Sequence, residues 1–337
     1  MASLSQPRER GWLRVLLGLA AFLLVPAVAG LRVLFPIEQT ILLVGPAIAV
    51  CALVAWVQGG RAWLALTWLS LSAWMLLRPL GDATQFEFLA RGWAILLVAI
   101  FGILCVIGGR QLFLSRALTT VAATFVFASA VIVVSDVSPM RVQRTVGDEL
   151  DRRAAPSTVL LEQSVADNPR AAELLEQMLA WWSALPDKTV ALFPALLALE
   201  SLAALALAWG VFHRISRSRI GPPLSGLREF RFGDQLVWGL LAGLVLTVTP
   251  SLADLRGLGY NLLLFFGALY LLRGMGVLAW FIGARRLPLV IVALLMIDIV
   301  VLDYLDLVFP PATTFLALSL GLGDTWIDWR GRARQPT

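Results

Sequence analysis

The chain alternates long apolar stretches with short polar segments. Ten stretches are long enough to cross a bilayer as helices, or nearly so, because the hydrocarbon core is about 30 Å thick and a helix rises about 1.5 Å per residue. Lipid offers the backbone no hydrogen-bond partners, so apolar runs of this length predict helices. We therefore expect an all-α polytopic transmembrane bundle of about ten spans. Their approximate ranges are 12–30, 37–57, 62–77, 91–108, 117–135, 189–212, 234–253, 258–282, 287–309 and 312–327.

The composition supports this class. Hydrophobic residues make up 59% of the chain and charged residues 15%, and the mean hydropathy is +0.83. This is more apolar surface than one soluble core can bury. The formal net charge of +5 comes from arginines that gather in particular loops, so we interpret it as topology and contact with anionic membrane lipids, and we expect no nucleic-acid partner.

The distribution of arginine predicts the orientation of the spans. Basic residues accumulate on the cytoplasmic side of a membrane, and only Arg32, Arg78, Arg91 and Arg256 fall in the short loops opposite the N-terminus. We therefore expect a multi-pass protein of the bacterial cytoplasmic (inner) membrane with both termini in the cytoplasm. The first span ends in Ala27-Val28-Ala29, which resembles a signal-peptidase site, but nine further spans follow and we expect it to be retained.

Three segments follow from the loop lengths: an N-terminal membrane segment (1–135), an external loop (136–188) and a C-terminal membrane segment (189–334). In the loop, Val142, Val146 and Leu150 recur every four residues and predict a short amphipathic helix.

A second helix in this loop is expected to begin at Asn168-Pro169, a good cap followed by a good first residue. Trp181 and Trp182 near its end favour an amphipathic interfacial segment on the outer side, acting as a lid or collar. The alternative is a connector packed on the bundle.

Charged and polar residues inside spans are the candidates for a ligand site, because they are costly in lipid. Glu200 lies near the middle of the sixth span and Arg273 at a similar depth in the eighth, so we predict an ion pair between them. Asn261 and Tyr270 add polar groups to the eighth span. The four residues form the predicted ligand-binding set, and structural hydrogen bonding within the bundle is the alternative.

The end of the chain carries a second kind of signal. Gly321-Leu322-Gly323-Asp324 resembles the GxGD signature of intramembrane aspartyl proteases, and Asp298 could supply the second member of a catalytic dyad. The motif is short, so the protease is only a third hypothesis.

Charge also gathers on the cytoplasmic side of the C-terminal segment. The loop before the seventh span carries Arg228, Glu229 and Arg231. We predict that it joins the closing residues Asp324, Asp328 and Arg330 in one cytoplasmic cluster. The alternative is two independent basic stretches lying on lipid headgroups.

The sequence lacks the residues that several kinds of enzyme site and metal site require. The single histidine, His213, excludes an HExxH zinc site and an intramembrane Ser–His pair, and Cys51 and Cys105 lie inside predicted spans. We therefore expect no metal and no cofactor. Because no GxxxxGK[ST] loop occurs, transport would need a gradient or a separate energising partner.

Several motifs of the C-terminal segment together suggest a family. They are Phe193-Pro194, Pro222-Pro223-Leu224, the Leu227–Phe232 stretch, Arg273-Gly274 and the closing Gly321–Arg330 stretch. Over residues 189–334 the chain resembles the YybS-like family of bacterial integral membrane proteins, and residues 1–135 match it only in hydropathy. The family is similar in look to the substrate-binding S components of energy-coupling-factor importers.

This resemblance implies a membrane protein that binds a small-molecule solute, and it brings no catalytic residues. We expect a solute-binding or transport-associated protein without its own ATPase. The alternative is a membrane scaffold or regulatory partner that acts through its basic cytoplasmic surface.

Overall fold

A computed structural model describes residues 12–24, 29–78, 84–108, 111–167, 172–215, 221–282 and 312–332. Over these ranges the chain forms helices and turns and contains no β-strand. It divides into two compact units, unit 1 (Met1–Leu224) and unit 2 (Ser225–Thr337). The predicted span 287–309 falls outside the described residues.

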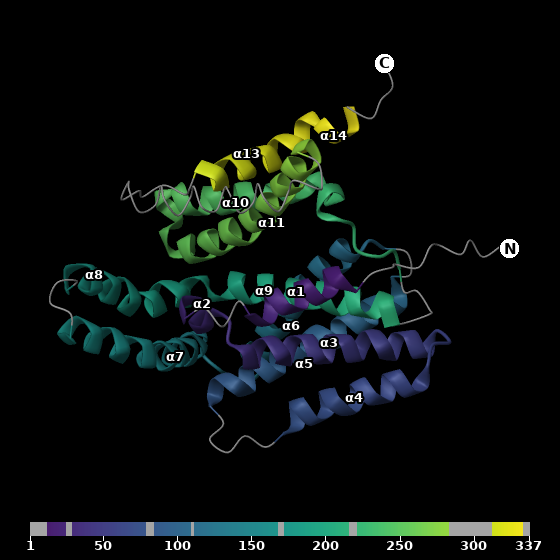
Figure 1. The fold of residues 1–337 in the computed structure, drawn as a ribbon, viewed down its shortest axis with the longest axis horizontal. Helices are drawn as coiled ribbons and strands as arrows, with labels where there is room; N and C mark the ends of the chain where they lie inside the picture. The colour runs from purple at the N-terminus through teal and green to yellow at the C-terminus, as the bar shows by residue number, and fades with distance from the viewer. Residues whose placement is uncertain are drawn as a thin grey trace. The chain divides into compact units, whose positions relative to one another are not determined.

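Unit 1 consists of helices joined by short connections (Figure 1). They are α1 (Leu13–Leu24), α2 (Ala29–Leu34), α3 (Ile37–Val57), α4 (Ala62–Leu77), α5 (Gln85–Ile107), α6 (Phe113–Val134), α7 (Pro139–Asp167), α8 (Ala172–Ser183) and α9 (Leu185–Ile215). Helix α9 therefore packs with the N-terminal helices, although the sequence placed it in the C-terminal segment.

Unit 2 begins with the short 3-10 turns η2 (Leu227–Glu229) and η3 (Asp234–Leu236). Its helices are α10 (Val237–Val248), α11 (Arg256–Ile282), α13 (Ala312–Ile327) and α14 (Trp329–Arg332), with the 3-10 segment η4 (Pro250–Leu255) between α10 and α11. Helix α10 ends just before Pro250, which lacks the N–H that would continue the helix.

Five helices in the described part of the chain are long and apolar enough to cross a membrane: Ile37–Val57, Gln85–Ile107, Phe113–Val134, Leu185–Arg214 and Pro250–Ile282. Three more apolar helices, Ala62–Leu77, Asp234–Val248 and Thr314–Ile327, are shorter. Within the predicted first span, 12–30, the structure describes the 12-residue helix α1 and the first two residues of α2. The count of ten spans stays a prediction.

Capping residues explain where the structure departs from the predicted boundaries. Helix α5 begins at Gln85, six residues before the predicted start at 91, because the Thr84 hydroxyl accepts a hydrogen bond from the Glu87 N–H at 3.3 Å. This is an N-cap, which satisfies one of the free donors at the helix start. The predicted span 37–57 has the same bounds as α3.

Helix α3 is the centre of unit 1 and packs against α4, α5 and α9. It runs antiparallel to α4, and Gly45 leaves room for Met75, whose sulfur lies 3.0 Å from the position that a Cβ on residue 45 would take. Helix α3 is apolar on all sides and most of it is buried, as expected for a helix surrounded by others.

The two ends of unit 1 can be assigned from contacts. At one end, Trp209 of α9 donates through Nε1 to the Pro222 carbonyl at 3.1 Å, and Arg116 of α6 donates to the Gly108 carbonyl at 3.3 Å. At the other end, the rings of Phe86 and Phe193 lie 5.9 Å apart. The first end carries the arginine-rich loops, in agreement with the alternation of loops along the sequence.

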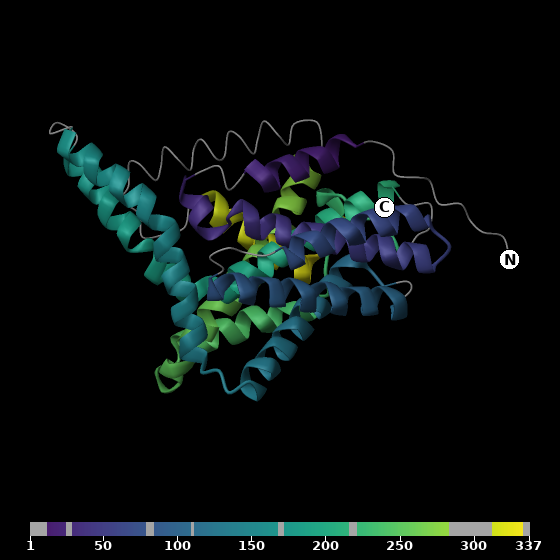
Figure 2. The same cartoon turned by 90° about the horizontal axis from the view of Figure 1, so that it is seen from below.

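Helices α7 and α8 lie side by side in both views (Figures 1 and 2). The predicted short helix is wrong in length, because α7 has 29 residues and continues through Pro156. Its stripe is used for packing. Val146, Leu150 and Ala154 form a buried cluster with Val33, Phe86 and Trp182.

The burial of Trp182 favours a connector packed on the bundle. Its side chain is 7% exposed and its Nε1 donates to the Ala154 carbonyl at 3.3 Å. A tryptophan held in this way belongs to the α7–α8 contact, so it no longer supports the predicted interfacial anchor.

In unit 2, glycines bring α11 close to both of its neighbours. Gly243 of α10 lies against Leu262 and Leu263, so the GxxxG pair of α10 serves packing within the chain. On the opposite side, a Cβ added to Gly274 would overlap the Ala317 carbonyl of α13, and one added to Gly321 would overlap the Tyr270 carbonyl. The backbones of α11 and α13 are therefore in direct contact.

The assignment of the two ends predicts a labelling pattern. Gln58→Cys and Met140→Cys, each in a background without Cys51 and Cys105, should react with a membrane-impermeant thiol reagent from opposite sides. Gln58 ends α3 at the arginine-rich end, so it should label from the cytoplasmic side. Labelling of both positions from one side would contradict this arrangement of α3 to α7.

The close approach of α11 and α13 predicts a contrast between two glycines of α11. Gly274→Ala should lower the free energy of unfolding by at least about 1–3 kcal/mol, because the added methyl group forces two backbones apart. Gly267→Ala is the control, since a Cβ there meets nothing within 4 Å, and it should be neutral or stabilising by up to about 1 kcal/mol. Equal effects, measured by unfolding in mixed micelles, would contradict this packing.

Candidate functional site

Glu200 is buried in the middle of α9. It is 4% exposed, and its carboxylate accepts one hydrogen bond from Gln39 Nε2 at 2.6 Å and one from Thr40 Oγ1 at 3.1 Å. Both donors lie in the first turn of α3, which begins directly after Pro36. The three residues, Glu200, Gln39 and Thr40, are called the Glu200 cluster below.

Neighbouring polar contacts on α9 are structural. The Ser201 hydroxyl donates to the Leu197 carbonyl at 2.7 Å and accepts from Trp93 Nε1 of α5 at 3.0 Å. Every strong donor and acceptor of this pair is thereby satisfied. Ser201 thus provides a buried polar position next to the Glu200 cluster but with separate partners.

The structure gives Glu200 and Arg273 hydrogen-bond partners within their own units, and the predicted pair between them stays a prediction. Arg273 donates through Nε to Asp324 Oδ2 at 3.0 Å, through a terminal nitrogen to Asp234 Oδ1 at 2.9 Å, and through the other to the Asp324 carbonyl at 3.1 Å. All three guanidinium nitrogens are occupied.

Asp324 is the centre of a buried charge network in unit 2. Besides Arg273, it accepts a hydrogen bond from Arg330 at 2.6 Å. The side chain of Asp324 is fully buried, and those of Arg273 and Arg330 are 4% and 2% exposed. Two guanidinium groups therefore share one carboxylate, away from water.

Arg330 also connects the closing helix to the loop that precedes α10. One terminal nitrogen donates to the Arg228 carbonyl at 2.9 Å and to the Phe230 carbonyl at 3.2 Å. An exposed ion pair between Arg231 and Asp328 lies between the same two segments. The structure thus brings the loop and the tail together, and Arg228 joins through its backbone.

The remaining members of the predicted cluster and ligand set lie as follows. The Glu229 side chain is exposed. Asn261 donates to the Gly257 carbonyl of its own helix at 2.7 Å. Tyr270 is buried, with its ring 5.0 Å from that of Phe232. Asn261, Tyr270 and Arg273 lie on α11 of unit 2 and Glu200 lies on α9 of unit 1, so the predicted ligand set stays a prediction.

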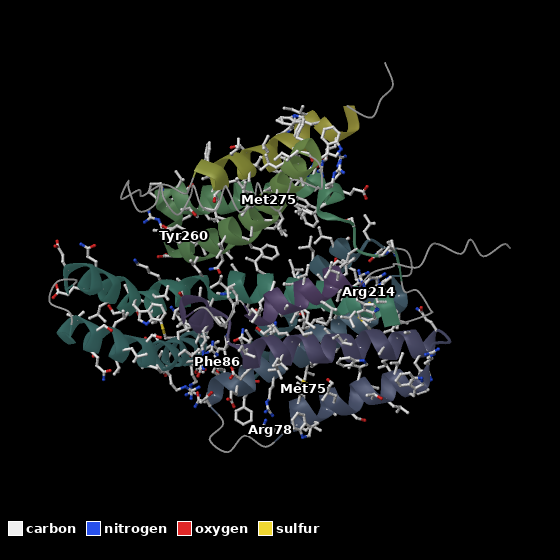
Figure 3. All side chains as sticks on the ribbon, in the orientation of Figure 1. Met75, Arg78, Phe86, Arg214, Tyr260 and Met275 are labelled. Atoms are coloured by element: carbon white, nitrogen blue, oxygen red, sulfur yellow. The ribbon has the colours of Figure 1, made fainter. Side chains whose placement is uncertain are left out.

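Figure 3 labels Phe86, at the end of unit 1 where α5 meets α7, and Tyr260 and Met275 on α11 in unit 2. Sequence reasoning missed Gln39 and Thr40, although two polar residues at the start of an apolar stretch were a usable signal. Asp234 could not have been found from the sequence, because an aspartate at the start of a span is ordinary.

No group of three or more His, Cys, Asp or Glu side chains in the described ranges is arranged to hold a metal ion. Asp298, one member of the predicted protease dyad, lies outside those ranges. The other member, Asp324, is bonded to two arginines, an environment suited to a permanent carboxylate.

Comparison with known proteins decides the family. A family model described as "Predicted membrane protein (DUF2232)" matches residues 27–309, which is most of the chain. The chain belongs to this family. It is therefore an integral membrane protein of the DUF2232 family. No curated protein and no solved structure matches the chain.

The match supports the expected membrane family but not the name YybS-like. It also differs in extent, because the sequence motifs pointed to residues 189–334, whereas the match begins at residue 27 and includes the spans of unit 1. It ends before α13, so Asp324 and Arg330 lie beyond the matched residues. The Glu200 cluster lies entirely within them.

The charge network predicts unequal effects for two aspartates of this DUF2232 protein. Asp324→Asn should lower the free energy of unfolding by about 3–5 kcal/mol, because two buried arginines lose their counter-ion. Asp328→Asn removes a partner from an exposed pair and should cost about 0–1 kcal/mol. Unfolding of both variants in the same mixed micelles would measure the contrast, and similar losses would contradict the buried network.

Proposed function

We propose that this protein takes part in solute transport across the bacterial cytoplasmic membrane, with Glu200 in its solute-binding site. The observation that carries the proposal is a carboxyl group buried in a membrane-spanning helix, with two polar partners and no ion pair in the described residues. Ionisable residues in such positions are functional by default, because lipid makes them expensive.

A purely structural role explains Glu200 less well. A charged side chain at the bilayer centre costs about 2.5–3.5 kcal/mol on insertion scales. A glutamine at position 200 could accept from Gln39 through its amide oxygen and donate to the Thr40 hydroxyl through its amide nitrogen, without this cost. The carboxylate of Glu200 therefore supplies a negative charge that the hydrogen bonds between α3 and α9 do not require.

The wider proposal agrees with the sequence. The resemblance to YybS-like proteins, and through them to the S components of energy-coupling-factor importers, favours a membrane subunit that binds a solute. The sequence has no ATP-binding loop of the GxxxxGK[ST] type. A gradient or a separate energising protein would then drive transport, with both termini of this chain in the cytoplasm.

The exposed part of the loop before α10 favours a second candidate function. Arg228 and Phe230 are held through their carbonyls by Arg330, while the Arg228 and Glu229 side chains remain exposed. A fixed loop with free charged side chains suits a scaffold or regulatory partner. Arg228→Ala would weaken capture of a protein partner in that case and leave solute binding unchanged.

Mutation of Glu200 tests the transport proposal. Wild-type protein and the Glu200→Gln variant are purified from native membranes, and small molecules released on denaturation are identified by mass spectrometry. We expect a solute with the wild type that falls at least tenfold in the Glu200→Gln sample, since glutamine can accept from Gln39 and donate to Thr40 but carries no charge. Ser201→Ala, a buried change on the same helix, should keep the solute.

Two outcomes would contradict the proposal. One is the absence of any specifically retained small molecule in the wild type. The other is equal retention by wild type and Glu200→Gln. Circular dichroism and the unfolding midpoint of each variant show whether the fold is intact.

A further inference from the structure

The Glu200 cluster contains an unused acceptor. Gln39 is 6% exposed, and its amide nitrogen donates to Glu200, yet its Oε1 has no hydrogen-bond partner among the described residues. A buried polar atom without a partner costs about 1–3 kcal/mol. Because the amide nitrogen is anchored on the carboxylate, Oε1 of the same amide lies close to Glu200.

The charge of the cluster is also unbalanced. Gln39 and Thr40 are neutral, and no described arginine or lysine forms an ion pair with Glu200. Both hydrogen bonds run toward the carboxylate, as a charged acceptor requires. The cluster therefore offers one negative charge and an unfilled oxygen, within a protein interior that excludes water.

We propose that Glu200, Gln39 and Thr40 form a binding site for a singly charged cation, either an alkali metal ion or a protonated amine. This inference rests on the proposed function only in placing the solute site at Glu200. The carboxylate supplies the charge, the Gln39 Oε1 fills the position that now lacks a partner, and the Thr40 oxygen retains a free lone pair. Carboxylate, amide and hydroxyl oxygens suit hard cations and N–H donors alike.

The residues around the Glu200 cluster favour a cation with a single charge. Arg153 of α7 interacts electrostatically with Glu200. Burial lowers the pKa of the Arg153 guanidinium, while Glu149 and then Glu200 act against this effect. Arg153 is engaged elsewhere, with Glu149, with the Val33 carbonyl at 3.4 Å and over the Phe86 ring at 4.7 Å.

A divalent ion would meet this positive neighbour with only one carboxylate to balance two charges. Calcium usually takes six to eight oxygen ligands, and magnesium keeps most of its water. Three oxygen-bearing side chains and one net charge match neither. We therefore expect the wild-type site to ignore divalent ions.

Cation titration of the full-length protein in detergent tests the site. Sodium, potassium and methylammonium chlorides are compared with choline chloride at equal ionic strength, and the unfolding midpoint is followed. We expect a saturable rise with at least one of the first three salts. A response to sodium or potassium identifies an inorganic ligand, and a response to methylammonium alone identifies an organic amine.

Two variants make the test specific. Glu200→Gln should abolish the response, and Ser201→Ala should keep it. Gln39→Glu adds a second carboxylate beside the first, so it should tighten binding of the monovalent cation at least tenfold and create a response to calcium or magnesium. A structural role for Gln39 predicts no such gain.

The inference is overturned if the wild type responds to none of the three salts beyond choline, or if Glu200→Gln responds as the wild type does. Should Glu200→Gln fail to fold, a Gln39→Glu protein without a divalent response would also overturn it. The transport proposal fails separately. A solute retained through Glu200 without any cation response supports transport alone, and a cation response without a retained solute supports this site alone.

Discussion

Buried charge is the constraint on which much of the described structure depends. In a medium without water, a charged side chain must meet opposite charge or several hydrogen-bond partners, and helices must approach closely enough to provide them. In unit 2 this is achieved by Asp324 and two arginines. The glycines at 274 and 321 let the backbones of α11 and α13 touch, and this contact brings Arg273 within 3.0 Å of Asp324.

The same constraint is met differently in unit 1. Asp324 has two guanidinium partners and its charge is compensated twice. Glu200 has an amide and a hydroxyl, which hydrogen-bond the carboxylate but cannot neutralise it. The first arrangement suits a fixed structural junction. The second leaves a requirement for positive charge, which is the physical basis of the solute and cation proposals.

The arrangement of α7 links the outer segment to the Glu200 cluster. Its apolar stripe packs against α2, α5 and α9, and one polar face carries Glu149 and Arg153. Arg153 thereby lies over Phe86 and interacts electrostatically with Glu200. A helix that looked like a surface element by composition thus contributes to the field inside unit 1, because its long side chains reach inward.

Local pattern was sufficient for the helices themselves. The predicted ranges 37–57, 62–77 and 312–327 have the same bounds as α3, α4 and α13. An apolar run in lipid forms a helix, and the polar residues on either side of it end the helix. The loop and tail charges were also assigned to one cluster, because short loops leave little choice of side.

Partners across the bundle depended on tertiary structure. Depth along a helix suggested that Glu200 could reach Arg273, but depth says nothing about which faces meet, and rotation and neighbour order gave each residue other partners. Gln39 and Asp234 were chosen by packing over distances of 161 and 39 residues in sequence. The sequence by itself determined a helical membrane protein with an arginine-rich side, because these follow from hydrophobicity and charge. Only the tertiary structure decided which charges pair, because a pair needs two faces brought together in three dimensions.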